Sequence, residues 1–270
     1  MTVIINYKNT KHSSTSGNLV FFVDESQSDS EYIYKSTAEG NFKIEREVTK
    51  SVFKISNFKS QADIANNKRR IIFPYHINKK GQAQPISEKT FKSQYPECYK
   101  YLWSQKAILS SRDKGKIKYE PFYVWGRTQG LTRVGKKIVN PTFSKYPRFL
   151  LVNDETAFFT NGYGIYFKNE KPLSVGLFSA NQHLLKLESN IDVVQKILNS
   201  CVMHYYVSKT SVSIAGGYPC YQKNFIAKFT IPNMSEKEIQ LLRKMENRDE
   251  IDAFLLKKYG LQIKKDMAII

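Results

Sequence analysis

The stretch TAFFTNGYGIYF, residues 156–167, carries the pattern that decides the fold class. Aromatic and isoleucine side chains, which are enriched in strands, stand on both sides of the Asn161-Gly162 pair. Asparagine followed by glycine is a turn signal because both residues tolerate a left-handed backbone. The stretch therefore predicts short strands separated by a turn.

The same pattern extends over residues 119–178, where short β-rich runs are broken by glycine, proline, asparagine and aspartate. Those runs are EPFYVWG (120–126), KKIVNPTF (136–143), RFLLVND (148–154) and SVGLFSA (174–180). Nearer the start of the sequence, residues 3–5, 18–25 and 69–73 are apolar runs that predict buried strands, the last of them stopped by Pro74. We expect residues 119–178 to be mainly β.

Helices are predicted on either side of this β-rich segment. Apolar residues recur every three or four positions over 96–112 and over 191–207, which predicts one amphipathic helix in each range. A capping box at Ser235 and a stop at Gly260 bound two short C-terminal helices, and residues 213–232 predict a glycine turn leading to a strand. The expected fold class is α+β, with a twisted, mainly antiparallel sheet braced by helices.

Net charge is the strongest constraint on the partner. The 270 residues include 42 Lys and Arg against 24 Asp and Glu, which gives +18 and a sequence pI near 9.6. Such an excess favours a polyanionic partner, because cations that neutralise phosphates release condensed counterions. A coding bias towards lysine is the alternative explanation. Half of the excess lies between Ser104 and Phe149, where eleven basic residues face two acidic ones and aromatic residues are interleaved.

Several other classes of protein are disfavoured. Three widely spaced cysteines without a CxxC pair indicate reduced thiols, and four histidines form no metal-ligand spacing. The N-terminal apolar run is too short for a signal peptide, and no window reaches the length of a membrane span. We therefore expect a cytoplasmic protein without a membrane partner or a metal site.

Motifs that suggest catalysis are incomplete. NPTF, residues 140–143, is similar to the Asn-Pro-Pro-Tyr/Phe loop of amino-methyltransferases, but its third residue is threonine and no glycine-rich S-adenosylmethionine loop precedes it. AGGYP, residues 215–219, lacks the lysine of a P-loop, and no acid followed by a Glu-x-Lys triplet lies on predicted strands as a nuclease would require. The chain contains no recognisable catalytic or cofactor-binding residues.

An ordered series of segments resembles the target recognition domain of TaqI-like adenine-N6 DNA methyltransferases, which belong to bacterial restriction-modification systems. The likeness covers nearly the whole chain and rests on the order of the segments. They are IIFPY (71–75), YPECYKYLWSQKAILSSR (95–112), FYVWGRTQGL (122–131), KIVNPTFSKYPRF (137–149), TNGYGIYF (160–167), ILNSCVMHYYVSKTSVSIAGGYPCYQKNFI (197–226), FTIP (229–232) and EIDAFLLKKYGL (250–261).

This resemblance implies a TaqI-like specificity domain that reads a short double-stranded DNA sequence while a catalytic partner flips and methylates the adenine. It implies that S-adenosylmethionine is bound by that partner domain or subunit and that this chain alone transfers no methyl group. Residues 1–95 are expected to form an N-terminal β-rich part, and residues 96–270 the core recognition domain with its C-terminal helices. The chain is then either an excised domain or a separately encoded specificity subunit.

Within the WGRTQG turn, we expect the aromatics at 122–125 to be an anchor and Arg127, Thr128 and Gln129 to be the reader. Arginine suits guanine or phosphate, and glutamine suits adenine. The resemblance also places the SKTSVSIAGGY loop (208–218) against DNA. Further expected contacts to phosphate or groove are Arg133, Lys136, Lys137, Lys145, Arg148, Lys209, Ser211, Ser213 and Tyr218.

Two other functions stay open from the sequence. One is an enzyme, either a minimal DNA methyltransferase that uses NPTF or a nuclease with an unrecognised site. The other is a module that binds RNA or another anionic partner. For each single candidate residue, a solvated side chain without a functional role is the alternative.

Overall fold

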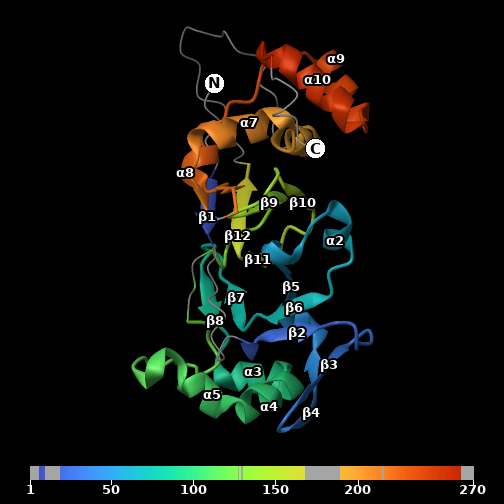
Figure 1. The fold of residues 1–270 in the computed structure, drawn as a ribbon. Helices are drawn as coiled ribbons and strands as arrows, with labels where there is room; N and C mark the ends of the chain where they lie inside the picture. Colours follow the sequence, from blue (N-terminus) through green and yellow to red (C-terminus); the bar gives the residue numbers. More distant parts are fainter. Residues whose placement is uncertain are drawn as a thin grey trace.

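A computed structural model describes residues 6–9, 19–126, 128, 130–167, 189–214 and 216–262. The described chain is elongated, with helices at both ends and two four-stranded sheets between them (Figure 1). The fold is mixed α+β, and nearly all of its strand pairs are antiparallel. This confirms the expected class, with several small sheets in place of one large sheet.

The two sheets meet at the stretch 156–167. In the first sheet, the strand order is β1 (Asn6–Asn9), β12 (Gly162–Tyr166), β9 (Lys137–Pro141) and β10 (Leu150–Val152). In the second, it is β11 (Phe158–Thr160), β5 (Thr49–Lys54), β6 (Arg69–Ile72) and β2 (Phe22–Asp24). The predicted turn separates β11 from β12, so the chain leaves one sheet and enters the other within a single residue.

Local backbone chemistry explains this passage. Asn161, between the two strands, has φ +58°, a left-handed conformation that asparagine tolerates. A Cβ on Gly162 would lie 2.5 Å from the backbone oxygen of Asn140, and one on Gly164 would lie 2.6 Å from the ring of Phe159. Only glycine fits these two positions without movement of β9 or of the buried ring. The Asn-Gly turn thus allows the two sheets to approach closely.

Three cores run along the molecule. The lower core contains most of the buried residues between Val20 and Leu131, together with Phe158. The central core, which includes Phe53 and Ile55, lies between the two sheets, and the upper core joins the first sheet to the C-terminal helices. The first sheet is buried on both faces, since Ile138 and Ile165 belong to the upper core while Val139 and Leu150 belong to the central core. Strand alternation produces this division because neighbouring side chains point to opposite faces.

The lower end consists of two hairpins and three helices. The hairpins are β3 (Tyr32–Thr37) with β4 (Gly40–Glu45), and β7 (Tyr75–Ile77) with β8 (Ala83–Pro85). The helices are α3 (Glu88–Gln94), α4 (Pro96–Ser104) and α5 (Lys106–Ser110). Ser87 caps α3 by accepting from the N–H of Thr90, and Pro96 is the first residue of α4. The predicted helix over 96–112 is interrupted at Gln105, whose side chain donates to the carboxylate of Glu39 at 2.8 Å.

Within residues 189–214 and 216–262, the upper end contains five helices: α6 (Ile191–Leu198), α7 (Cys201–Thr210), α8 (Lys223–Ile226), α9 (Glu236–Lys244) and α10 (Arg248–Tyr259). The single helix predicted over 191–207 is wrong, because Ser200 leaves the helical conformation and caps a new helix through the N–H of Met203. The capping box at Ser235 and the stop at Gly260, with φ +65°, are confirmed.

Two β predictions are also corrected. The glycine turn joins β13 (Ser213–Ile214) to β14 (Tyr218–Pro219), so the strand after the turn is only two residues long, and α8 follows where the predicted strand would continue. Between Lys116 and Lys136, the described positions contain turns and bends without a strand. The aromatics of that segment supply core packing, which strand propensity alone does not distinguish from sheet pairing. The β-rich run predicted at 174–180 lies outside the described residues.

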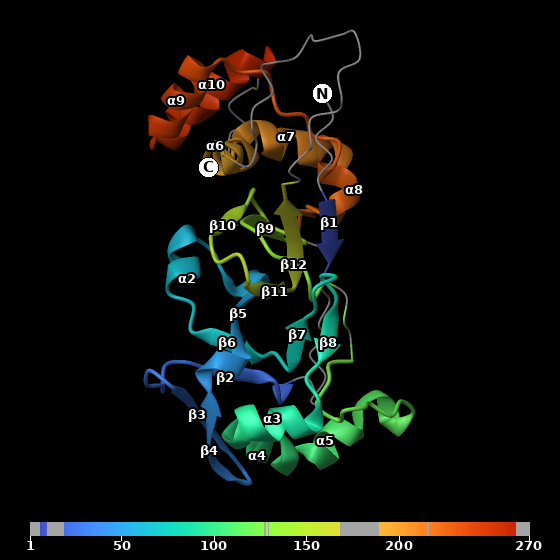
Figure 2. The same ribbon diagram turned by 180° about the vertical axis from the view of Figure 1, so that it is seen from behind.

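Side-chain amides cover the outer edge of β10. Asn199 accepts from the N–H of Phe149 and donates to its carbonyl, both at 2.8 Å. Gln61 of α2 (Gln61–Ala65) does the same for Leu151 at 2.9 and 2.7 Å, and Figure 2 shows α2 beside β10. Gln195 links the two by donating to Gln61 and to Phe149. These amides make the backbone hydrogen bonds that a neighbouring strand would make. They therefore block pairing of this edge with a strand of another molecule.

Packing continues across residue 95. The lower core contains Phe91 and Cys98 in the same cluster, and the N–H of Cys98 donates to the carboxylate of Glu45 at 2.7 Å.

The described helices include none long and apolar enough to cross a membrane.

Candidate nucleic-acid interface

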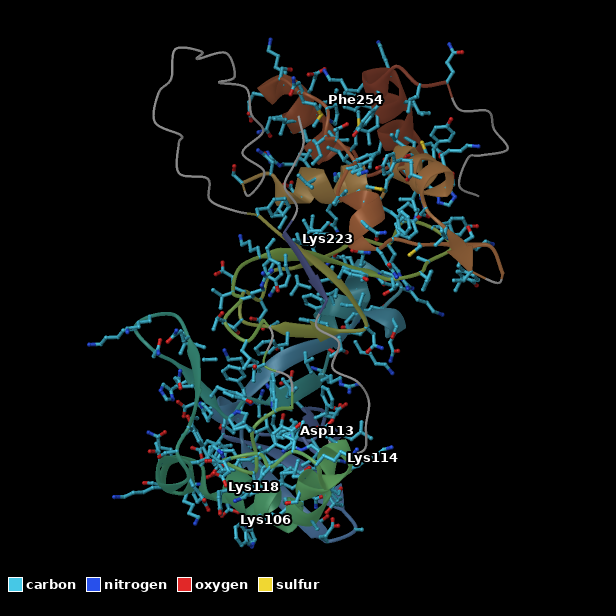
Figure 3. The ribbon with its side chains drawn as sticks, turned by 90° about the vertical axis from the view of Figure 1, so that its left-hand side faces the viewer. Lys106, Asp113, Lys114, Lys118, Lys223 and Phe254 are labelled. Carbon is cyan, nitrogen blue, oxygen red and sulfur yellow. The ribbon has the colours of Figure 1, made fainter. Side chains whose placement is uncertain are left out.

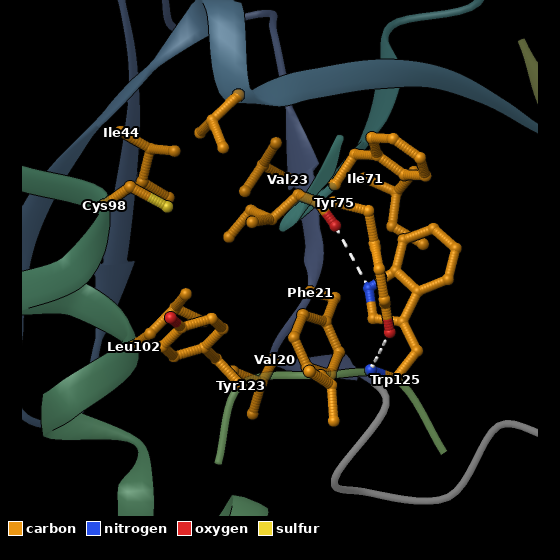
Figure 4. Packing of buried hydrophobic residues seen from close by; sticks show 14 of the residues in the cluster. Val20, Phe21, Val23, Ile44, Ile71, Tyr75, Cys98, Leu102, Tyr123 and Trp125 are labelled. Atoms are coloured by element: carbon orange, nitrogen blue, oxygen red, sulfur yellow. Dashed lines mark hydrogen bonds between the residues drawn. The ribbon is translucent and has the colours of Figure 1, made fainter. Parts of the chain in front are cut away.

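The aromatic turn at 122–125 is an anchor in the lower core, as predicted. Tyr123 and Trp125 are 0% and 4% exposed. The Tyr123 hydroxyl donates to the carbonyl of Ile86 at 2.7 Å, and the Trp125 indole donates to the carbonyl of Ile72 at 3.1 Å. The backbone N–H of Trp125 donates to the hydroxyl of Tyr75 at 2.6 Å (Figure 4). Buried polar tips are thus all paired, which fixes the turn.

The expected reader follows this anchor. Thr128 is exposed, whereas Arg127 and Gln129 lie outside the described residues. Gly130 has φ +84°, a left-handed conformation suited to a tight bend. The contact of this turn with DNA therefore stays a prediction.

Lys137 requires a correction, because its side chain is not available for phosphate. It is 1% exposed, and its ammonium donates to the carbonyls of Asp154, Glu155 and Ala157 at 2.9, 3.2 and 3.0 Å. Burial lowers the pKa of Lys137 to about 8. The adjacency of the two lysines in the sequence gave no sign of this. Lys136 lies just before β9 and is exposed, whereas Lys137 is the first residue of β9, all of whose residues are buried.

The other basic candidates near β9 have different surroundings. Lys136 is exposed just before β9, and the guanidinium of Arg133 lies 5.8 Å from the ring centre of Tyr166. Arg148 is half-buried near Asp63, and burial lowers its pKa. Its Nε has no hydrogen-bond partner among the described residues.

Beyond β9, the structure brings together two segments far apart in the sequence. Phe143 forms a β-bridge with Cys220, and the N–H of Tyr221 donates to the carbonyl of Thr142 at 2.8 Å. The N–H of Ser144 donates to the carbonyl of Pro219 at 3.4 Å. These contacts place the loop that carries Lys145 against the base of the β13–β14 hairpin.

We call this region the hairpin surface, made of residues 209–214, 216–220, Lys145 and Lys223. Lys145, Lys209 and Lys223 are exposed around its base. The tip contains Gly216 and Gly217 with φ +90° and +73°, so the backbone turns sharply there. Of the predicted residues, Lys145, Lys209, Ser211, Ser213 and Tyr218 meet on this surface.

Two exposed apolar side chains at the hairpin, Val212 and Ile214, were missed by sequence reasoning, whereas Tyr218 was among the predicted contacts. Val212, Ile214 and Tyr218 are 59%, 46% and 43% exposed, and Ile214 pairs with Tyr218 across the strands. Alternation of apolar residues with Ser211 and Ser213 was the available signal, but nothing in the pattern showed that both faces of so short a hairpin meet solvent. Exposed apolar side chains on a hairpin that has exposed lysines around its base are suited to a ligand that offers both anions and apolar surface.

The hairpin is fixed from behind by buried polar groups. Asn140 is 0% exposed, and its amide donates to the carbonyls of Pro141 and Tyr221 at 2.9 and 3.0 Å. The Tyr221 hydroxyl lies 3.1 Å from Nδ1 of His204, and burial lowers the pKa of that imidazole. The NPTF segment is thus a structural joint between β9 and the hairpin.

The described residues include no group of three or more His, Cys, Asp or Glu side chains placed to hold a metal ion. No protein-family model matches the chain, and no curated protein matches it either. The resemblance to TaqI-like specificity domains therefore rests on the ordered segments of the sequence.

Proposed function

We propose that this chain is the sequence-specific double-stranded DNA recognition domain or subunit of an adenine-N6 DNA methyltransferase in a restriction-modification system. Its fold would be of the TaqI-like specificity type, and it would act in the cytoplasm. The partners would be duplex DNA and a methyltransferase catalytic domain or subunit that binds S-adenosylmethionine. The observation that supports this most directly is the hairpin surface, where residues implied by the resemblance meet.

The chemistry of the hairpin surface fits duplex DNA. Exposed ammonium groups of Lys145, Lys209 and Lys223 can neutralise phosphates on both sides of a groove. The glycine tip allows close approach of the backbone, while Ile214 and Tyr218 offer apolar contact to base edges such as a thymine methyl group. Arg127 and Gln129, in the WGRTQG turn, stay the proposed base readers.

The competing proposal of a minimal methyltransferase through NPTF is less well supported. In amino-methyltransferases this loop holds the amino group of a flipped adenine, which requires an accessible asparagine side chain. Asn140 is fully buried, and its amide nitrogen bonds two carbonyls of the chain itself. We favour the recognition function because it requires no rearrangement of this joint.

A salt-titration experiment tests the proposed interface. Lys145→Ala combined with Lys209→Ala should flatten the slope of log affinity against log salt concentration by about two units, because each lost phosphate contact removes about 0.9. Binding to fluorescent duplex DNA would be measured by anisotropy between low and physiological salt. Lys79→Ala with Lys80→Ala, two exposed lysines of the β7–β8 loop, is the matched control and should leave the slope unchanged.

Two results would contradict the proposal. If the hairpin double variant kept the slope of the unchanged protein, these lysines would not face phosphate. If single-stranded RNA competed as well as duplex DNA, the chain would be an RNA-binding or general polyanion-binding module. Sequence preference itself would be read by mapping methylated adenines in cells with and without the gene.

A further inference from the structure

The lower end of the molecule carries an exposed aromatic surface that the proposed function does not use. Of the two tryptophans, Trp125 is buried, whereas Trp103 on α4 is 49% exposed. Its ring stacks on Tyr99 with 5.9 Å between centres and meets the edge of Phe122 at 5.8 Å. Leaving an indole in water forgoes a large part of its burial energy, so an exposed aromatic cluster is suited to a partner.

The base of this cluster is rigid. Arg112 is 6% exposed and donates to the carbonyls of Leu109, Phe122 and Val124 at 2.7, 2.8 and 2.6 Å. These bonds tie the end of α5 to the aromatic turn and fix the position of Phe122. Trp103 therefore rests on a support that is already ordered, which reduces the entropy lost on binding.

Ammonium groups cover the ring faces. Nζ of Lys106 lies 4.0 Å from the ring centre of Trp103 and 5.3 Å from that of Phe122, while Nζ of Lys92 lies 4.9 Å from Tyr99. Lys106 is exposed and makes no ion pair among the described residues, whereas Lys92 pairs with Glu88. Other exposed lysines at this end of the molecule are Lys100, Lys114, Lys116 and Lys118, of which Lys118 pairs with Glu120 at 2.6 Å.

We propose that the aromatic surface of Tyr99, Trp103 and Phe122, with Lys106, binds single-stranded nucleic acid. An unpaired base would stack on the indole face that Lys106 now covers, and the ammonium would move to the adjacent phosphate. Each nucleotide of a single strand offers an unpaired ring and an anion, which suits the exposed ring of Trp103 with the ammonium of Lys106 beside it. Duplex DNA offers base edges in place of faces, so the paired form should bind this surface less well.

This site is distinct from the hairpin surface. Figure 3 labels Lys106, Lys114 and Lys118 at the lower end and Lys223 in the upper part of the molecule. Loss of one site should therefore leave the other intact. The inference does not depend on the proposed recognition function, and the two can fail separately.

Anisotropy with a fluorescent oligothymidylate of about 15 nucleotides tests the site, because its bases are unpaired and stack freely. Trp103→Ala should weaken binding about tenfold or more, since base stacking on one aromatic ring typically contributes that much. Trp103→Phe should restore part of the affinity, and Lys145→Ala with Lys209→Ala should change it little. In the unchanged protein, bound oligonucleotide should quench tryptophan emission, because Trp103 is the exposed one of the two.

Equal oligothymidylate affinity for the unchanged protein and Trp103→Ala would overturn the inference. So would tighter binding of duplex DNA than of the oligonucleotide in the hairpin double variant, where the proposed duplex site is weakened. Quenching of Trp103 emission by polyglutamate at the same concentration of charge would indicate an acidic protein segment as the partner and would also overturn it. Circular dichroism of the variants separates these outcomes from misfolding.

Discussion

Lys137→Met should lower the free energy of unfolding by about 2 to 4 kcal/mol at neutral pH, because three buried carbonyls lose a charged donor. The ammonium of Lys137 is their shared partner in the structure. Lys136→Met is the matched control. The side chain of Lys136 is exposed, so its replacement should change the free energy of unfolding by less than about 0.5 kcal/mol. Urea unfolding of the three proteins measures the difference.

The pH dependence of stability, compared between the unchanged protein and Lys137→Met, gives an independent check. The pKa of Lys137 is about 8 in the folded protein, below the ordinary value of 10.5. Between these two values the unfolded chain binds more protons than the folded one, so stability rises with pH. The unchanged protein should therefore gain stability relative to Lys137→Met from pH 8 towards pH 10, by up to about 1.4 kcal/mol per pH unit. Equal pH profiles would mean that Lys137 is solvated.

Asn140→Ala should cost about 2 kcal/mol of unfolding free energy, because the carbonyls of Pro141 and Tyr221 lose their buried donor. We also expect faster amide exchange at Tyr221, whose N–H bonds Thr142 across the same joint. Asn153→Ala, an exposed asparagine after β10, is the control and should change neither quantity. Thermal or urea unfolding with hydrogen exchange measures both.

This variant also separates the two proposed functions. If NPTF were catalytic, Asn140→Ala would abolish methyl transfer with little loss of stability. Saturable binding of S-adenosylmethionine to the purified chain at micromolar concentration would point the same way and contradict a recognition-only function. Loss of stability in Asn140→Ala is the result expected from the structure. No binding of S-adenosylmethionine is the result expected from the proposed recognition function.

Secondary structure was predictable where local chemistry decides it. The capping box at Ser235, the proline start of α4 and the glycine stop at Gly260 each act within one turn of helix, and all three are present. The break at Ser200 was missed because apolar periodicity continues through it, although a serine cap can end one helix and begin another. Apolar periodicity shows which face of a helix is buried, but it does not show whether the helix is continuous.

The candidate site was less predictable, because it depends on contacts between distant segments. The loop that carries Lys145 is held at the hairpin by backbone contacts of residues 142–144 with residues 219–221, a pairing that no local pattern encodes. Charge clustering placed Lys106 and Lys145 in one basic segment, yet the structure places Lys106 at the lower end and joins Lys145 to the hairpin of the upper part. Lys137 was likewise not predictable from local sequence. It was expected at the surface, but the strands on either side of β9, which are β10 and β12, bury it.

The passage from β11 to β12 also constrains the order in which the protein can fold. Phe158, Phe159 and Thr160 pair with Val52, Phe53 and Lys54, about a hundred residues earlier in the chain. As the polypeptide emerges from the ribosome, β5 must therefore wait for β11 with one edge unpaired and with the lower core still lacking Phe158. Closing so long a loop is slow. A nascent chain that pauses before residue 158 would present that open edge to other chains, so this junction is where synthesis and aggregation compete.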